Sequence, residues 1–327
     1  MKNFKHPYPC EYMQQNNLTV KGVSDDLRAF RVELRASGGG EYLTLLQLNV
    51  WRPIFDIVVD WLVIAFAVVF VLEFGWWFAP CAVLVIANRQ RALGNILHDA
   101  GHRNLHRSHW VNDTLAMALV APLLFVDLLA YRDSHFRHHL RLGSDADPDK
   151  LARPPVGSWL KHYGTHLLTA SLWWESAFGH IKGTARVSVL RRLYILGWWA
   201  VAYSLLWLHF GSSCLATFLT LWMLSRTTVF HAITIFREMC DHYGLVEGGV
   251  FSYTRDIVKK SIWRHLVHPR NNGYHLIHHL LPAVPYYKLE EAQRLFSRTP
   301  TYREQSHVCD SYVFGLAPVV RRWHSEE

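Results

Sequence analysis

Long parts of this 327-residue chain lack the charges that a soluble domain distributes over all of its helices. Residues 53–88 contain no lysine or arginine, and residues 193–225 contain no charged residue at all. The chain is 50% hydrophobic, and each of these stretches is long enough to cross a hydrocarbon core of about 30 Å. These absences argue against an ordinary soluble domain and predict membrane-spanning helices.

Three further patterns are missing. The five cysteines include no C-x-x-C pair, which indicates a reduced compartment without a disulfide framework. The N-terminal segment has no apolar run, so no cleavable signal peptide is expected. The H-E-x-x-H motif is absent, which argues against a zinc-dependent membrane hydrolase.

The chain has a net charge of +8, and its basic residues lie in polar blocks beside the apolar ones. This placement favours contact with a membrane surface or an acidic protein partner over nucleic-acid binding.

The apolar residues form two long blocks, each interrupted near its middle by a turn signal. A continuous helix over 54–88 would be roughly 50 Å long, so Gly75 and the two tryptophans after it mark a turn. Gly211 begins a similar Gly-Ser-Ser turn in the second block. The sequence therefore predicts an all-α integral membrane protein with four spans in two hairpins. The predicted spans are about 54–73, 76–97, 193–210 and 213–236.

The distribution of lysine and arginine predicts the orientation of these spans. The turns near 75 and 211 carry neither residue, whereas the blocks outside the hairpins carry nearly all of them. By the positive-inside rule, the turns face away from the cytoplasm and the polar blocks form a cytosolic cap.

The chain is expected to divide into a cytosolic segment (1–50), a membrane domain (51–300) and a C-terminal tail (301–327). Within the membrane domain, residues 114–131 are mostly apolar but contain Pro122 and Asp127. A span there would separate the histidines before it from those after it, so a re-entrant or surface-lying segment is expected.

Histidine is unusually frequent, with 21 residues, and three motifs contain most of the candidates for chemistry. One H-x-x-x-H pair and two H-x-x-H-H turns place their imidazoles on one helix face each. A buried imidazole needs partners for both ring nitrogens, and the leucines around the third motif offer none. The motif histidines are His98, His102, His135, His138, His139, His275, His278 and His279.

Eight converging imidazoles exceed the ligands of one structural or catalytic zinc ion. They suit two metal ions, each with an open coordination position, although imidazole ligands alone leave Zn, Cu, Fe and Ni open. His242, just past the fourth predicted span, is expected as a ninth ligand. Glu238 and Asp241 are expected either to fix imidazole tautomers or to pair with Arg237, and Asp133 has the same two interpretations.

Other histidines are interpreted as ordinary residues. His106 and His109 follow the first motif beside two arginines and are expected on the surface. His231, within the fourth predicted span, is expected to form hydrogen bonds in the core, the alternative being a residue that lines a substrate tunnel.

The motifs together resemble the membrane fatty-acid desaturase superfamily. The matching stretches are HDAGH at 98–102, HFRHH at 135–139, DHYG at 241–244 and NNGYHLIHHLLPAVPYYKL at 271–289. The resemblance covers roughly residues 50–295. It implies a mushroom-shaped helical membrane protein that holds a non-haem di-iron centre under its cytosolic cap and uses O2 as co-substrate.

Carried over by position, the resemblance makes the eight motif histidines and His242 the iron ligands. Asn271 would order the turn before the third motif or bind a metal-bound water. The chain departs from many members of the superfamily at Ile277, where glutamate is common, and at His106, where an apolar residue is common. No fused cytochrome b5 pattern is present, so the expected electron donor is a separate protein of ferredoxin, rubredoxin or cytochrome b5 type.

An aliphatic C–H bond offers no acidic proton or leaving group, so its cleavage requires an oxidant that a cofactor must supply. The expected function is therefore an O2-dependent di-iron oxidoreductase, in the first place a fatty-acyl desaturase. The alternative is a hydroxylase, ketolase or oxidative decarboxylase that acts on a lipid, carotenoid or carrier-bound acyl substrate. A zinc hydrolase would leave six histidines unexplained, and a metal transporter would need ionisable residues within its spans, which 193–225 lacks.

Overall fold

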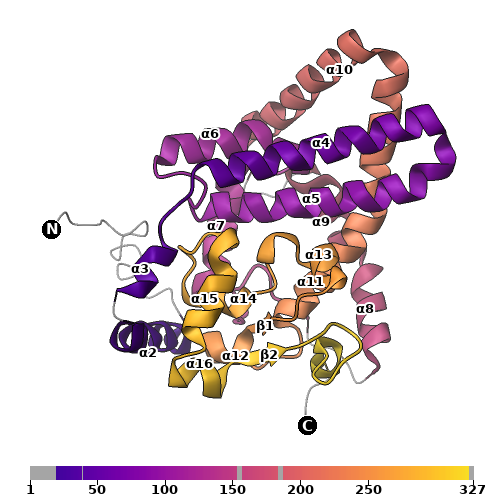
Figure 1. Cartoon of the computed structure of the whole chain (residues 1–327). Helices are drawn as coiled ribbons and strands as arrows, with labels where there is room; N and C mark the ends of the chain where they lie inside the picture. Colours follow the sequence, from indigo (N-terminus) through magenta and orange to yellow (C-terminus); the bar gives the residue numbers. More distant parts are fainter. Residues whose placement is uncertain (1–19, 39, 153–156, 183–186, 324–327) are drawn as a thin grey trace.

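The computed structural model describes residues 20–38, 40–152, 157–182 and 187–323. The prediction that the N-terminal segment contains no signal peptide concerns residues 1–19 and lies outside this range. The predictions for residues 324–327 lie outside it too. In Figure 1 the long helices α4, α5 and α10 lie with α6 in one half of the molecule, and the shorter elements lie in the other half.

The first long hairpin turns at the predicted place. Helix α4 (Trp51–Phe74) and helix α5 (Ala79–Gly101) are joined by a 3-10 turn, η1 (Trp76–Phe78). Gly75 has a φ of 97°, a conformation that a side chain would strain, and this residue ends α4.

The second hairpin is one long helical stretch with a sharp break. It consists of α10 (Val189–Ser225), a π-helical turn named η4 (Arg226–Phe230) and α11 (His231–His242). Gly211, at φ 80° and ψ 175°, is non-helical, and Figure 1 shows the chain reversing direction within α10. The turn expected near residue 211 is therefore present.

Among the residues that the structure describes, two helical stretches are long and apolar enough to cross a membrane, α4 and Val189–His242. Helix α5 fails this criterion because its second half carries Gln90, Arg91 and Asn95, which are buried inside the protein. Hydropathy along the sequence is a poor guide for such a helix, since residues buried against protein need not be apolar. The arrangement of four spans is taken up below as a proposal.

Residues 114–131 do not form one helix. Helix α6 (His109–Leu119) is followed by the 3-10 turn η2 (Pro122–Leu124) and then by α7 (Leu128–Arg141). The carboxylate of Asp127 caps α7 by accepting a hydrogen bond from the backbone N–H of Ala130 at 2.8 Å. The proline and the aspartate therefore divide the segment, as expected for a chain that turns back.

The remaining helical elements are shorter than α4, α5 and α10. They are α2 (Lys21–Gly38), α3 (Glu41–Leu45), α8 (Trp159–Leu167), α9 (Ala170–Phe178), η3 (Gly179–Lys182), α12 (Val250–Tyr253), α13 (Ile262–Val267), η5 (Pro269–Asn271), α14 (His275–Leu280), η6 (Tyr286–Lys288), α15 (Leu289–Phe296), α16 (Pro300–Gln305) and η7 (Val319–Trp323).

The structure adds one element to the predicted all-helical fold, a small parallel sheet. Strand β1 (Arg255–Ile257) pairs with β2 (His307–Cys309), with Asp256 opposite Val308. Strands of three residues leave no period-2 pattern in a sequence, because two alternations are too few to recognise. The described residues are otherwise mostly helical.

Candidate metal centre

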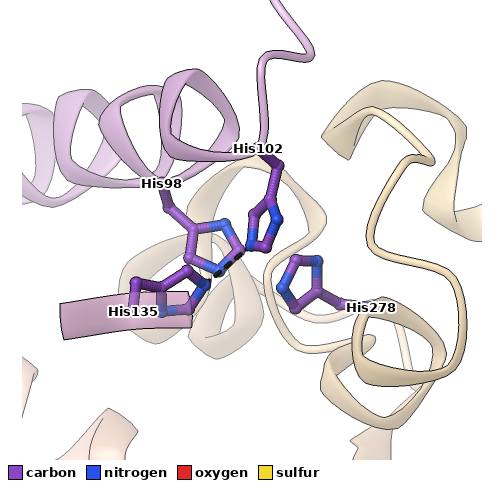
Figure 2. A group of neighbouring side chains, drawn as sticks. All are labelled: His98, His102, His135 and His278. Atoms are coloured by element: carbon purple, nitrogen blue, oxygen red, sulfur yellow. Dashed lines mark hydrogen bonds between the residues drawn. The ribbon is translucent and has the colours of Figure 1, made fainter. Parts of the chain in front are cut away.

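Four helix ends meet at one place inside the molecule. His98 lies in the last turn of α5, and His102 follows directly after that helix. Helix α7 provides the second motif, α14 provides the third, and His242 is the last residue of α11. Figure 2 shows imidazoles from α5, α7 and α14 pointing toward one another.

Group 1, as named here, consists of four buried histidines, each of which offers one ligand atom within 4.8 Å of the others. The Nε2 atoms of His135 and His102 are 2.8 Å apart, the contact drawn as a dashed line in Figure 2. Helices α5, α7 and α14 all contribute. The members of group 1 are His98, His102, His135 and His278.

Group 2 also consists of four buried histidines, and each offers one ligand atom within 4.8 Å of the others. The Nε2 atom of His275 lies 2.8 Å from that of His242 and 3.0 Å from that of His279. His138 completes the group, with its Nε2 3.3 Å from that of His279. The members of group 2 are therefore His138, His242, His275 and His279.

His139 lies between the two groups and belongs to neither by this criterion. Its Nε2 atom is 3.1 Å from Nε2 of His135 and 3.1 Å from Nε2 of His278. Its ring stacks on that of His279 with centroids 4.2 Å apart. The structure therefore brings all nine candidate ligands from the sequence together, eight of them in two groups.

The donor set fits one metal ion in each group. A neutral imidazole has one N–H donor and one lone pair. In His138 and His242 the Nδ1 atom is hydrogen-bonded to Asp147 and to the carbonyl of Tyr253, so Nε2 carries the lone pair that faces the group. The Nε2 atom of His98 is buried without a hydrogen-bond partner among the described residues. Facing lone pairs repel each other unless a cation lies between them.

Burial favours the neutral imidazoles that a metal ion requires. Desolvation lowers the pKa of His102, His135 and His278 well below the usual value, and the charges of neighbouring imidazoles lower it further. Protonation therefore does not compete with a metal ion for these lone pairs near neutral pH.

Asp147 positions one imidazole of group 2. Its carboxylate accepts a hydrogen bond at 2.8 Å from Nδ1 of His138, and the backbone N–H groups of Gly143 and Asp149 also donate to it. Burial opposes a charge on His138, but the bond to Asp147 and the charges of Asp147, Asp149 and Glu238 together outweigh burial and raise its pKa. The sequence alone did not distinguish Asp147 from the other acidic residues of its loop.

Asp241 forms the second carboxylate contact with group 2. It lies 3.6 Å from Nδ1 of His275, 3.1 Å from Nε2 of His268 and 2.9 Å from Nη2 of Arg237. Asp241 therefore contacts imidazoles and also pairs with an arginine, so the two interpretations offered by the sequence do not exclude each other. His268, fully enclosed beside Asp241, was not among the candidates.

The other two acidic candidates pair with arginines. Glu238 pairs with Arg237. Asp133 pairs with Arg137 at 2.8 Å, one helical turn away, and its side chain is 62% exposed. Their contacts correspond to the charge-pairing alternative.

Two polar residues hold the third motif in place. Asn271 accepts a hydrogen bond from Arg264 and donates one to the carbonyl of Tyr286, which ties the turn before α14 to the next segment. Asp256 accepts hydrogen bonds from the backbone N–H groups of Leu276 and Ile277 at the start of α14. Burial raises the pKa of Asp256 to about 7. Its position on a strand that the sequence did not predict explains why it was missed.

The histidines interpreted as ordinary residues lie outside both groups. His109 is exposed, and His106 accepts a hydrogen bond from the backbone N–H of Ser108. His231 is hydrogen-bonded through both ring nitrogens, to Ser176 and to the carbonyl of Leu167, as expected for a core residue.

Known proteins resemble this chain over most of its length. The sequence model described as "Fatty acid desaturase" matches residues 74–311. The "Dihydrorhizobitoxine desaturase" of Bradyrhizobium elkanii is 28% identical over 78% of this chain and 77% of its own length. The "sn-1 acyl-lipid omega-3 desaturase (ferredoxin)" of Nostoc sp. (strain 36) is 23% identical over 75% of each chain. The "sn-1 oleoyl-lipid 12-desaturase" of Arthrospira platensis is 26% identical over 75% of this chain and 72% of its own.

Proposed function

Because the chain belongs to the fatty acid desaturase family, we propose that it is an O2-dependent di-iron desaturase that inserts a double bond into an aliphatic chain. The observation that supports this proposal most directly is the pair of buried four-histidine groups at the inner ends of the long helices. Two all-imidazole groups suit two metal ions, and the family match favours iron and the oxidation of an unactivated C–H bond, for which a cofactor must supply the oxidant.

The proposed iron ligands are the eight histidines of groups 1 and 2 together with His139, which is placed to serve either ion. When bound, the two irons would supply the activation of O2. The protein would orient the imidazoles through Asp147, Asp241 and the carbonyl of Tyr253. Asn271 would keep the turn before α14 in the conformation that presents the third motif.

The overall reaction balances with an external electron donor. Two hydrogen atoms leave adjacent carbons, and together with two electrons and two protons they reduce one O2 to two waters. The name of the Nostoc relative includes ferredoxin, which supports a ferredoxin-type donor for this chain, with rubredoxin and cytochrome b5 types as the other candidates. Two of the relatives are named for acyl-lipid substrates and one for dihydrorhizobitoxine. The names support an acyl lipid as the first candidate substrate, and a carrier-bound acyl group is the other candidate that we propose.

Iron content and product identity together test this proposal. Protein purified from iron-supplemented cells is expected to contain about two irons per chain, because each group offers a complete set of imidazoles. Metal is measured by elemental analysis, and products formed with a ferredoxin system are identified by mass spectrometry. Loss of two hydrogens supports desaturation, and gain of one oxygen would identify a hydroxylase. One zinc per chain, with no iron taken up on reconstitution, would refute the di-iron assignment.

We further propose that the protein is an integral membrane protein with four spans, formed by α4, α5 and the two parts of the Val189–His242 stretch. The two stretches that meet the length and hydropathy criteria support it. So does the exposure of apolar side chains such as Phe66 on α4 and Leu208 on α10. In this arrangement the cytosolic segment at 1–50, the inner part of the 51–300 domain and the 301–327 tail all face the cytoplasm, and the iron site opens on that side.

Thiol labelling in intact cells is expected to show this topology. Trp77 at the α4–α5 turn is 94% exposed, and Asp145 in the opposite half has a fully exposed side chain. In a background without reactive native cysteines, Trp77→Cys should react with a membrane-impermeant maleimide in whole cells. The matched Asp145→Cys variant should react only after permeabilisation. Labelling of both variants from the outside would contradict the proposed topology.

A further inference from the structure

Two arginines lie buried between α5 and the π-helical turn without a carboxylate partner. Arg91 is 9% exposed and Arg226 is 2% exposed. No ion pair joins either guanidinium to a carboxylate of the described residues, whereas Arg89, on another face of α5, pairs with Asp60 at 2.9 Å. Arginine stays charged when buried, so each unpaired guanidinium carries a desolvation penalty of several kcal/mol.

Arg226 is only partly satisfied by its surroundings. Its Nε donates to the carbonyl of Ala177 at 2.9 Å, and its Nη2 donates to the carbonyl of Leu124. The guanidinium also lies over the rings of Phe125 and Phe230. Its Nη1 atom is buried and has no hydrogen-bond partner among the described residues. The contacts fix the guanidinium in place and leave one edge free to bind a ligand.

Arg91 has the same character on the facing helix. Its Nη2 donates to Asn95 at 2.9 Å, while its buried Nε has no hydrogen-bond partner in the described part of the chain. Helix α5 packs against the π-helical turn that carries Arg226, so the two arginines stand on elements in contact. Two like charges buried in this way repel each other, and an anion bound between them would relieve the repulsion.

Neutral polar groups that lack partners occur close to the two arginines in the sequence, on α5 and at the end of α10. The side chain of Gln90 donates to the carbonyl of Trp222, which joins α5 to α10 at this level. The indole N–H of Trp222 and the hydroxyl of Ser225 are buried, and neither has a hydrogen-bond partner among the described residues. The Oε1 atom of Gln90 is also buried without a hydrogen-bond partner in the described part of the chain. Unsatisfied polar atoms of this kind favour a polar ligand over an apolar chain.

Arg91 lies on the same face of α5 as the histidines of the first motif. Arg91, Asn95, His98 and His102 are spaced i, i+4, i+7 and i+11, so they follow one face of α5. Arg91 is about 10 Å from His98 along the helix, on the side away from the cap. The methyl end of a lipid acyl chain that passed group 1 in this direction would meet desolvated guanidiniums, which it cannot satisfy.

We propose that the substrate is a free carboxylic acid, whose carboxylate binds Arg91 and Arg226 while its aliphatic carbons lie against group 1. This proposal rests on the proposed desaturase function and replaces the acyl lipid and the carrier-bound acyl group with a free acid as the substrate class. Because the guanidinium of Arg91 lies beside Asn95, one turn before His98, the reactive carbons would lie only a few bonds from the carboxylate. A polar substrate of this kind needs no lipid head group for recognition.

Binding of model compounds to the iron-loaded protein without O2 tests the proposal separately from catalysis. The probes are octanoate and its uncharged equivalents 1-octanol and methyl octanoate, measured by competition with labelled octanoate in nanodiscs. A hydrogen bond to a charged group contributes about 1.5–3 kcal/mol, so octanoate is expected to bind at least about tenfold more tightly than either. Arg91→Gln should remove this preference, and Arg89→Gln is the matched control that should keep it.

Equal binding of octanoate and 1-octanol to the wild-type protein would overturn the proposal without any variant. So would an unchanged octanoate preference in a folded Arg91→Gln protein, with folding checked by its iron content. If hexadecanoate bound more tightly than octanoate and its binding still depended on Arg91, the carboxylate site would be supported. The substrate would then be a long-chain free fatty acid. A protein that binds no iron would contradict the proposed function instead, so the two failures are distinguishable.

Discussion

Replacing His278 with alanine is expected to abolish desaturation and to reduce bound iron from about two ions per chain to about one or none. His278 is the only member of group 1 that comes from α14, and its Nε2 also lies 3.1 Å from that of His139. Its loss leaves three imidazoles in group 1 and removes one of the two Nε2 contacts between this group and His139, the other being with His135. Iron is measured by elemental analysis, and activity is measured as loss of substrate in a ferredoxin system.

The matched control is His106→Ala, which removes an imidazole from the segment just after the first motif. His106 lies outside both groups, and its described hydrogen bond is to the nearby backbone of Ser108. This variant should retain most of its iron and activity. Full activity in the His278→Ala protein would refute the site, and loss of iron in the His106→Ala protein would show that the first motif extends beyond His102.

Replacing Asp241 with asparagine is expected to weaken iron binding and activity by about 10- to 100-fold, the usual range for residues that orient metal ligands. Asp241 is buried and interacts with His275, His268 and Arg237 at once. The amide keeps the shape but removes the charge, so Arg237 loses a buried partner and the imidazole of His275 loses the carboxylate charge 3.6 Å from its Nδ1. Iron affinity is measured by competition with a chelator.

Asp133→Asn is the control for this experiment, because it removes the same charge from the surface. The pair with Arg137 is exposed, and exposed ion pairs contribute about 0–1 kcal/mol. We expect iron affinity to change less than about threefold in this variant, within that energy range. If both aspartate variants bound iron equally well, Asp241 would have no orienting role, and its contacts would be explained by ion pairing alone.

The sequence could predict the features that depend on local spacing. A spacing of three or four residues places side chains on one helix face whatever the rest of the chain does, so the three histidine motifs could be recognised directly. The turns at Gly75 and Gly211 were predictable for a similar reason, since an uninterrupted apolar helix would be too long for a bilayer. The proline and aspartate within 114–131 likewise indicated a segment that is not one helix.

Only the packing of the helices decided how the motifs divide between the two groups. Each H-x-x-H-H turn contributes histidines to both groups. His135 lies in group 1 and His138 in group 2, while His278 lies in group 1 and its neighbour His279 in group 2. Histidines on one helix face point in slightly different directions, and the positions of the other helices determine which neighbours each imidazole meets. Spacing along one helix carries no information about those positions.

The acidic partners and the buried arginines also required the tertiary structure. Asp133 and Asp241 look alike in the sequence, each near a histidine and a basic residue, but one is exposed and the other is enclosed. Asp147 and Arg91 carry no local signal, because what distinguishes them is the residues that other segments place beside them. The sequence determined which residues could carry the chemistry and where the chain turns. Burial and contacts between distant segments decided which carboxylates orient the imidazoles and which charges lie unpaired inside the protein.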